Sequence, residues 1–315
     1  MAKVTNAFDT YTATADREQL SDIIYNISPM QTPFLSSVGT SNVSNVVFDW
    51  QTESLPTPSS TGQLEGFELS RAASTATVRE SNVCMISSRD ATVTGSQEAS
   101  DAAGKNSEMA HQLALMAKAL KRDMEEALTQ NIAKVTGTAS AARQTRSLET
   151  WYQTNVNKAS DGANGSASAA RTNGTRRDLT EALLKDVQQQ CFTSGAEPSI
   201  LMCGPYNKSV ISGFTGRSQA RQFVDANTIE ASVSIYSGDF GELVVPSNRS
   251  REQAVHLLDP EFAGVAYLRN FETIDISTIG DAQTKMIVVE YGLEMKNEAA
   301  HGIIADVKVS STDAG

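Results

Sequence analysis

The chain has 315 residues, of which 40% are hydrophobic and 20% charged, so it can bury a large core in one elaborate domain or two ordinary ones. Its 37 acidic residues outnumber its 26 basic ones and give a net charge of −11, which disfavours tight binding to nucleic acid because phosphates are held by cations. No stretch approaches the roughly 18 consecutive apolar residues of a membrane span, and the first residues, MAKVTNAFDT, lack the apolar core of a signal peptide.

The first predicted element is a short amphipathic helix at residues 16–27. Asp16 followed by Gln19 resembles a capping box, and Pro29 ends the pattern. The apolar face consists of Leu20, Ile23, Ile24 and Ile27. No core lies nearby in the sequence, so we expect this helix either under the main domain or on a neighbouring molecule.

A long hairpin is predicted next. The apolar period becomes two at residues 46–51, and a second extended stretch rich in Thr, Val and Ser covers 75–94. Between them, residues 55–69 contain two prolines and two glycines among serines and threonines, which predicts a flexible tip. The two arms have too few apolar residues to form a core, and an isolated two-stranded ribbon is marginal in water. The hairpin is therefore expected to lie on another surface.

The strongest pattern is a long helix at residues 105–134. Apolar residues recur three or four positions apart, at Met109, Leu113, Met116, Leu120, Met124, Leu128 and Ile132. Thirty helical residues would extend roughly 45 Å. A single apolar stripe of that length indicates a helix packed under a sheet. A coiled coil is the less favoured interpretation, because alternating charges at the flanking heptad positions are missing.

The segment at residues 136–175 is rich in Ser, Ala, Gly, Asn and Thr, which predicts a long loop of functional or mobile character. Only Leu148, Trp151 and Tyr152 are expected to anchor it.

A compact α/β segment follows. A helix is predicted from Asp178, capped together with Glu181 and closed by Gly195. A buried strand at 199–203 leads to a helix that starts at Pro205 and ends at Gly216. Further strands are predicted at residues 229–235, 240–245, 255–258 and 264–268.

Two strands end the predicted fold. Residues 285–296 alternate between apolar and polar, which predicts a long strand buried on one face, and residues 303–309 form another. We expect both strands to cover the long helix.

No catalytic, cofactor-binding or metal site is predicted. Gly104-Lys105 before a helix is similar to a phosphate-binding loop, but Ala99 and Asn106 stand at positions where that motif requires Gly and Ser or Thr. His111, His256 and His301 have no second ligand at metal spacing. Glu290 and Glu294 could form a carboxylate pair, although alternating charge on a solvated sheet face is the favoured interpretation.

The three cysteines, Cys84, Cys191 and Cys203, are odd in number and far apart in the sequence. They are predicted to be small apolar core residues in a reducing compartment rather than a disulfide framework.

An arm, an extended hairpin, a long helix, a separate α/β part and final strands, in this order, resemble the major capsid protein of tailed bacteriophages, whose fold is shared with herpesvirus capsids and encapsulins. Particular stretches resemble most the branch from podoviruses with elongated heads. These are SEMAHQLALMAKALKRDMEEALTQN, YSGDFGELVVPSNR, HLLDPEFAGVAYLRNF and GDAQTKMIVVEYGLEMKNEAAHG. The likeness spans roughly residues 29–309.

The resemblance implies an α+β fold with an N-terminal arm at 1–44, an extended hairpin loop at 45–97, a peripheral domain at 98–147 and 271–315 that contains the long helix, and an α/β axial domain at 148–270. It implies a structural protein of the virion without enzymatic activity. Such a protein self-assembles as hexamers and pentamers into an icosahedral or elongated shell around double-stranded DNA in the cytoplasm of a host bacterium.

The expected partners are further copies of the chain, a portal protein, a separate scaffolding protein and a decoration protein, with weak non-specific contact to packaged DNA and none to a membrane. Because the arm helix begins near Asp16, no fused scaffold is expected. The alternative is an encapsulin-type compartment, which has the same fold but holds enzyme cargo. An enzyme would need a pocket with reactive groups, and the sequence suggests none.

Overall fold

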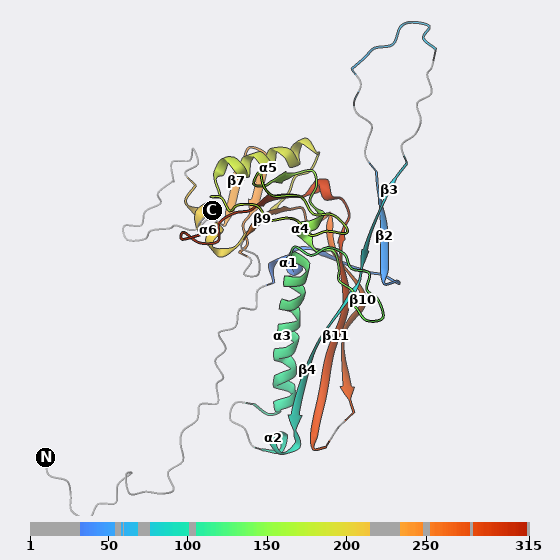
Figure 1. Cartoon of the computed structure of the whole chain (residues 1–315), viewed down its shortest axis with the longest axis vertical. Coiled ribbons are helices and arrows are strands. Elements are labelled where there is room, and N and C mark those ends of the chain that lie inside the picture. The colour runs from blue at the N-terminus through green and yellow to red at the C-terminus, as the bar shows by residue number, and fades with distance from the viewer. Residues whose placement is uncertain are drawn as a thin grey trace, which may run out of the picture.

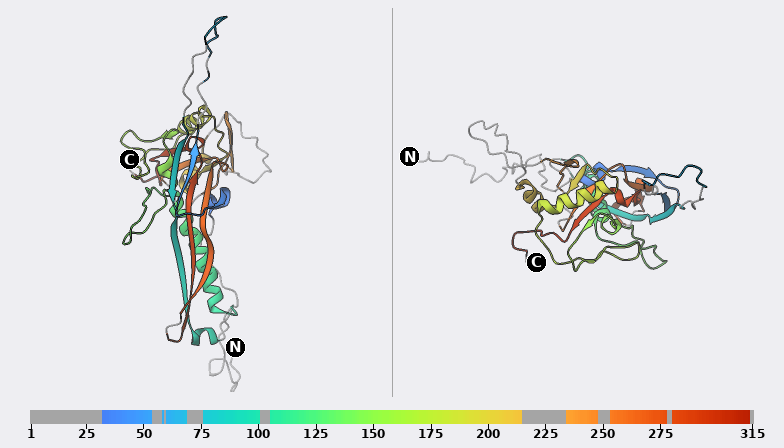
Figure 2. Two further views of the ribbon diagram at one scale, coloured as in Figure 1. Left: turned by 90° about the vertical axis from the view of Figure 1, so that its right-hand side faces the viewer. Right: turned by 90° about the horizontal axis from the view of Figure 1, so that it is seen from above.

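The computed structural model describes residues 32–53, 58, 60–68, 76–100, 105–214, 234–247, 253–277 and 280–313. The helix predicted at 16–27 lies outside these residues. Figure 1 shows three parts: a narrow arm with the long helix α3, a broader α/β part, and a hairpin that projects from the body in the direction opposite to the arm. Figure 2 shows that the hairpin and the arm extend along the same long axis.

The narrow arm is built on a four-stranded sheet in the order β1-β10-β11-β4. The strands are β1 (Gly39–Asn42), β10 (Ala263–Ile276), β11 (Ala282–Met295) and β4 (Met85–Thr94). β1 pairs parallel with β10, whereas β10 with β11 and β11 with β4 are antiparallel. The short helix α2 (Gly95–Ala99) follows β4 at the far end of the arm.

The predicted long helix is α3 (Glu108–Thr129), with 22 residues and a length of ~33 Å. It begins where the Ser107 side chain accepts a hydrogen bond from Ala110 N. It ends before Ile132, because the Ile132 backbone is bound instead by the hydroxyl of Ser147, 2.6 Å from the Ile132 nitrogen. α3 packs mainly on β4 and β11, which confirms a helix under a sheet. Among the described helices, none is both long and apolar enough to cross a membrane.

Strand β11 differs from the prediction of one buried face. All residues from Ile287 to Leu293 are buried, those on the side away from α3 included. At Gly292 the second face is covered by the two-stranded ribbon of β2 (Val47–Thr52) and β3 (Val78–Val83), whose Phe48 ring lies on this glycine, and at Glu290 it is covered by Arg143 and Arg269. A Cβ atom at Gly292 would meet Phe48 Cε1 at 2.7 Å, so glycine is needed for this close contact.

The broader part contains a six-stranded sheet in the order β5-β12-β9-β6-β8-β7. Its strands are β5 (Val156–Asn157), β12 (Gly302–Ala305), β9 (Ala254–Leu258), β6 (Ile200–Met202), β8 (Gly241–Val244) and β7 (Ile235–Gly238). The helices of this part are α5 (Glu181–Thr193) and α6 (Pro205–Ser212), and Figure 1 shows α5 lying across the sheet. The cap of α5 is Thr180 and not Asp178, because the Thr180 side chain accepts from Leu183 N.

Several other boundaries were predicted close to their observed positions. The strand at 199–203 is β6, the helix from Pro205 is α6, and the hairpin after residue 235 is β7–β8, whereas most of the strand predicted at 229–235 lies outside the described residues. Helix α6 ends at Ser212, with Gly213 as its C-cap, rather than at Gly216.

Two segments belong to different sheets from those predicted. β12 pairs with β9 and β5 in the six-stranded sheet, so it does not cover the long helix as expected for 303–309. The returning arm predicted at 75–94 is divided at Cys84: β3 pairs with β2, and β4 joins β11 in the arm. Of the stretch predicted at 75–94, only the part before Cys84 therefore belongs to the hairpin. The α1 helix (Pro33–Ser37), α4 (Leu148–Trp151) and the short η1 turn (Glu298–Ala300) complete the fold.

Candidate assembly surfaces

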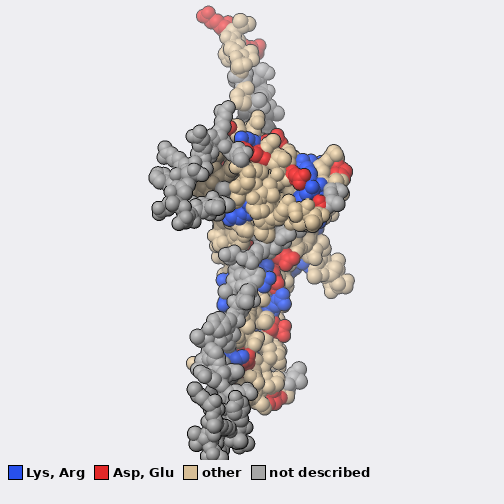
Figure 3. Space-filling model, turned by 90° about the vertical axis from the view of Figure 1, so that its left-hand side faces the viewer, with Lys and Arg blue, Asp and Glu red and all other residues tan. Residues whose placement is uncertain are grey.

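The tip of the hairpin, residues 60–68, exposes two large apolar side chains. Leu64 is 84% and Phe67 50% exposed. They flank a turn in which Phe67 N donates to the Leu64 carbonyl at 3.0 Å, and Gly66 adopts a φ of +78°, which favours glycine. Glu65 and Glu68 are exposed beside them, and Figure 3 shows acidic side chains at this end. The tip combines exposed apolar area with negative charge, as interaction surfaces do.

The base of the hairpin, strands β2 and β3, is fixed to the body. The Asn82 side chain is fully buried and donates to the carbonyls of Leu293 at 2.6 Å and Arg146 at 3.2 Å. Its Oδ1 atom accepts from the backbone nitrogen atoms of Arg146 and Val83. On the neighbouring strand, Trp50 lies 5.4 Å from Trp151, measured between ring centroids. One end of the ribbon is thus bound within the subunit and the other projects from it.

The first described residues are bound to α3. Glu125, on the second turn from the end of α3, is 1% exposed and accepts hydrogen bonds from the backbone nitrogens of Phe34 and Leu35, both at 2.9 Å. Burial raises the pKa of Glu125, and the two backbone donors lower it in part. The chain that precedes α1 therefore meets the body beside this residue.

The segment at 136–175 was predicted as a mobile or functional loop, and the structure places one continuous part of it, residues 145–152, in the interior. Leu148, Trp151 and Tyr152 are buried, which confirms the three predicted anchors. Buried polar residues accompany them in the same stretch: Thr145, Arg146, Ser147, Glu149, Thr150 and Arg171. The composition of this segment predicts a loop, but it carries no signal for the buried ion pairs that fix the loop in place.

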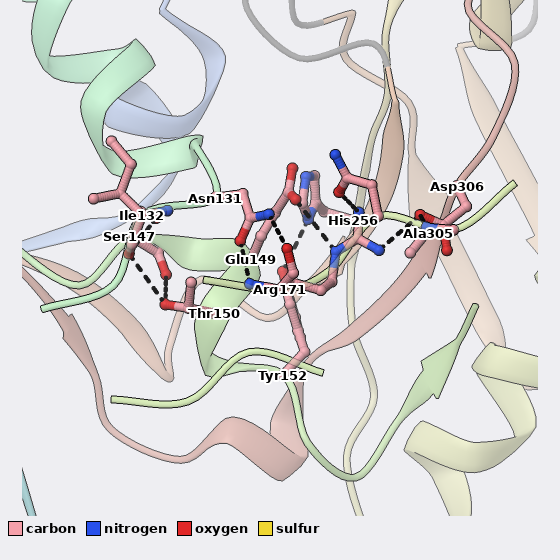
Figure 4. A network of polar contacts seen from close by, with 12 residues as sticks. Asn131, Ile132, Ser147, Glu149, Thr150, Tyr152, Arg171, His256, Ala305 and Asp306 are labelled. Carbon is pink, nitrogen blue, oxygen red and sulfur yellow. Dashed lines mark hydrogen bonds and ion pairs between the residues drawn. The ribbon is translucent and has the colours of Figure 1, made fainter. Parts of the chain in front are cut away.

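Arg171 is the centre of these polar contacts (Figure 4). Its guanidinium lies 2.8 Å from Asp306 Oδ1 and 3.5 Å from Glu149 Oε2, with all three side chains 1% exposed or less. The Arg171 backbone exchanges two hydrogen bonds with the Asn131 side chain, just after α3, at 2.6 and 2.7 Å. Asp306 also accepts from the backbone nitrogen atom of Gly174 at 3.0 Å. The network joins the end of α3, the 136–175 segment and the strand end of β12.

Another buried carboxylate, Glu290, binds Arg143 in the first part of the 136–175 segment. Glu290 was assigned to a solvated sheet face, yet it is 4% exposed and its two oxygens accept from Arg143 at 2.6 Å and Arg269 at 2.9 Å. Glu294 is only partly buried and accepts from the hydroxyl of Ser41 at 2.7 Å. The two carboxylates bind different elements, so the structure does not bring them together as a pair.

The cysteines, His256 and Lys105, which the sequence offered as candidate reactive residues, are buried or bound to neighbouring side chains of the same chain. The three cysteines are buried and free, as predicted, and burial raises the pKa of Cys84 to about 11 and of Cys191 and Cys203 to about 12. His256 stacks on Tyr152, with the Tyr152 hydroxyl 3.2 Å from His256 Nδ1. Lys105 pairs with Glu108 in the first turn of α3.

The two other histidines differ in exposure. His301 is fully buried, whereas His111 is partly exposed on α3. Among the residues that the structure describes, no three His, Cys, Asp or Glu side chains gather as a metal site would require.

The chain matches the SU10 major capsid protein family over residues 3–308. It is similar to the major capsid protein of Escherichia phage Phieco32, with 23% identity over 94% of this chain and 96% of that protein.

Solved structures with the same fold include the capsid of a native GTA particle, with a TM-score of 0.64, 13% identity, and coverage of 95% of this chain and 98% of that one. A protein of Mycobacterium phage Bobi has a TM-score of 0.61, 12% identity, and coverage of 93% and 96%. The SrpI encapsulin of Synechococcus elongatus PCC 7942 has a TM-score of 0.55, 10% identity, and coverage of 96% and 95%.

These structures confirm the mixed helix-and-sheet fold of tailed-phage capsid proteins that the resemblance implied. Because the family match covers nearly the whole sequence, the chain belongs to the SU10 major capsid protein family and is a major capsid protein.

Proposed function

We propose that this capsid protein self-assembles as hexamers and pentamers into an icosahedral or elongated shell that encloses viral double-stranded DNA. The observation that carries the proposal is the hairpin: its base is buried in the subunit, and its tip exposes Leu64 and Phe67 without a core beneath them. An exposed apolar tip on a projecting ribbon gains stability only by contact with another molecule. In a shell that molecule is a neighbouring copy.

The proposal includes the division into the arm at 1–44, the hairpin loop at 45–97, the peripheral domain at 98–147 and 271–315, and the axial domain at 148–270. Strand pairing supports two refinements. β4 is best grouped with the peripheral sheet, because it pairs with β11, and β12 with the axial sheet, because it pairs with β9.

The partners in this proposal are further copies of the chain, a portal protein, a separate scaffolding protein and a decoration protein, with assembly in the cytoplasm of a host bacterium. The net charge of −11 suits a wall that touches packaged DNA weakly and without sequence preference. No enzymatic activity is proposed, since the buried polar groups described above contact one another and not an open cleft.

The test is deletion of residues 55–69 from the full chain. We expect the variant to remain folded, with an unchanged circular dichroism spectrum and unfolding midpoint, and to form no shells by electron microscopy, or only shells that dissociate more readily. Shells of normal number and stability from this variant would contradict the proposal. A matched control replaces the same residues by an equally long Gly-Ser segment, which restores the length of the tip but not its apolar side chains.

An encapsulin-type compartment is the second candidate, because the SrpI encapsulin has the same fold. The two functions differ in what the purified particles contain. Portal and tail proteins together with DNA support the viral shell, whereas a single enriched enzyme inside the particles supports the compartment. Mass spectrometry of native particles distinguishes them.

A further inference from the structure

Three cations on α3 have no acceptor. Lys118, Lys121 and Arg122 are exposed, and their spacing of three and four places them on one helix face; they are called the α3 cation cluster below. In the described part of the chain, every other Lys or Arg forms an ion pair or donates a hydrogen bond, and these three do neither. Figure 3 shows basic side chains on the α3 side of the narrow arm. In a chain of net charge −11, a group of unmatched cations is unusual.

Exposed aromatic surface lies beside the cluster. The Phe271 ring on β10 is 41% exposed, and Lys121 Nζ lies 6.0 Å from its centroid. The Tyr267 ring, also on β10, is 6.5 Å from the Phe271 ring. DNA phosphates would match the cations but leave the aromatic ring in water. A peptide segment with carboxylates and apolar side chains would match both, so the surface favours such a segment.

The chain itself enters the body at one end of this face. Glu125 binds the backbone of Phe34 and Leu35, and Arg122, Lys121 and Lys118 stand three, four and seven positions before Glu125 on α3. These offsets lie on one side of a helix. The first described residues, at Phe34 and Leu35, are therefore bound on the side of α3 that carries the cation cluster.

We propose that residues 16–27 of the same chain bind along the α3 cation cluster and the Phe271 ring. This segment, DREQLSDIIYNI, carries three carboxylates, one arginine and an apolar face, and it lies outside the described residues. Its charge and its apolar side chains complement those of the surface. As a helix it would be ~18 Å long, shorter than α3, and five residues, 28–32, link it to α1. So short a tether gives an effective concentration in the millimolar range, which favours the segment of the same chain over that of a neighbour.

Hydrogen exchange of the full-length protein, measured on subunits before assembly and again in particles, tests the proposal. We expect the amides of residues 16–27 to exchange at least ~10-fold more slowly than those of an unstructured peptide of the same sequence. The triple variant Lys118→Glu, Lys121→Glu, Arg122→Glu should lose this protection. Adding Asp16→Lys, Glu18→Lys and Asp22→Lys to that variant should restore it. The control Lys185→Glu with Lys296→Glu, exposed cations elsewhere, should leave it unchanged.

A cysteine pair identifies the chain that supplies the segment. Ile24→Cys with Phe271→Cys should form a disulfide within one chain when isotope-labelled and unlabelled copies are mixed and oxidised. Three results would each overturn the proposal: no protection of residues 16–27, protection that is kept in the triple variant, or disulfides that form only between copies. Lower DNA retention by the triple variant with unchanged protection would assign the cluster to DNA and overturn it as well. This inference goes beyond the proposed shell function, and shell formation is scored separately by electron microscopy, so the two can fail independently.

Discussion

The base and the tip of the β2–β3 hairpin belong to one ribbon and have opposite surroundings. At the base, Asn82 is fully buried with four hydrogen bonds to backbone groups, and Phe48 is packed on Gly292. At the tip, Leu64 and Phe67 are exposed. The base thus contributes to the stability of a single subunit. The tip buries neither of these apolar side chains in the subunit and leaves them available for contact with another molecule.

The core between α3 and the four-stranded sheet should tolerate substitution least. Leu120 on α3 is fully buried in the main core, so Leu120→Asp places a charge among apolar side chains and should cost more than ~5 kcal/mol, enough to prevent folding. The protein is expected in the insoluble fraction. Glu126→Ala, at an exposed position of the same helix, should change the free energy of unfolding by about 0.5 kcal/mol or less. Soluble, folded protein from both variants would show that the stripe is not buried.

The attachment of the hairpin base should show the next largest effect. Asn82→Ala leaves buried backbone groups of Arg146 and Leu293 without partners, which should lower the free energy of unfolding by about 3 kcal/mol. Urea unfolding followed by tryptophan fluorescence measures it directly, because both tryptophans, Trp50 and Trp151, lie side by side at this site. The exposed variant Thr77→Ala should be neutral within about 0.5 kcal/mol. Equal effects would remove the distinction between buried base and exposed ribbon.

Acid should destabilise the buried interior of the subunit. Burial lowers the pKa of His301 to about 4 from an ordinary value of 6.5. Between these values the unfolded chain binds a proton that the folded chain does not, so stability is complete above pH 6.5 and falls as the pH drops towards 4. The loss from this residue should approach ~3 kcal/mol. In urea unfolding at a series of pH values, His301→Gln should remove this part of the slope.

The sequence predicted the elements whose side chains repeat with a regular period. The stripe on α3, the strand at Phe48 and Trp50, and the helix at Pro205 each appear in the sequence because a packed face repeats every 3.6 or 2 residues. Their ends were less accurate where a distant residue decides them, as Ser147 does when it binds the Ile132 backbone after α3.

The assembly of these elements could not be predicted from the period. β11 alternates in sequence, yet both its faces are buried, because the ribbon that covers the second face is encoded more than 200 residues earlier at Phe48 and Val83. The same holds for the ion pairs of Arg171 with Glu149 and Asp306, whose partners are separated along the chain and leave no local pattern. Resemblance to a known fold, and not periodicity, predicted the function.

The smallest expected effect concerns covalent bonds between subunits, of which we expect none. In some tailed phages a lysine on the extended hairpin attacks an asparagine amide of a neighbouring subunit and links the shell covalently. That reaction needs a primary amine, and arginine cannot replace it because its guanidinium stays protonated. Between residues 45 and 104 the chain has no lysine, and its cations there are Arg71, Arg79 and Arg89.

Cys84, the one cysteine of this stretch, is buried at the hairpin base, so a disulfide at the tip is excluded as well. Contact through the tip must then be non-covalent, by burial of Leu64 and Phe67 and by hydrogen bonds. Particles boiled in denaturant should release a single band near 33.7 kDa. A ladder of multiples of that mass would contradict this prediction.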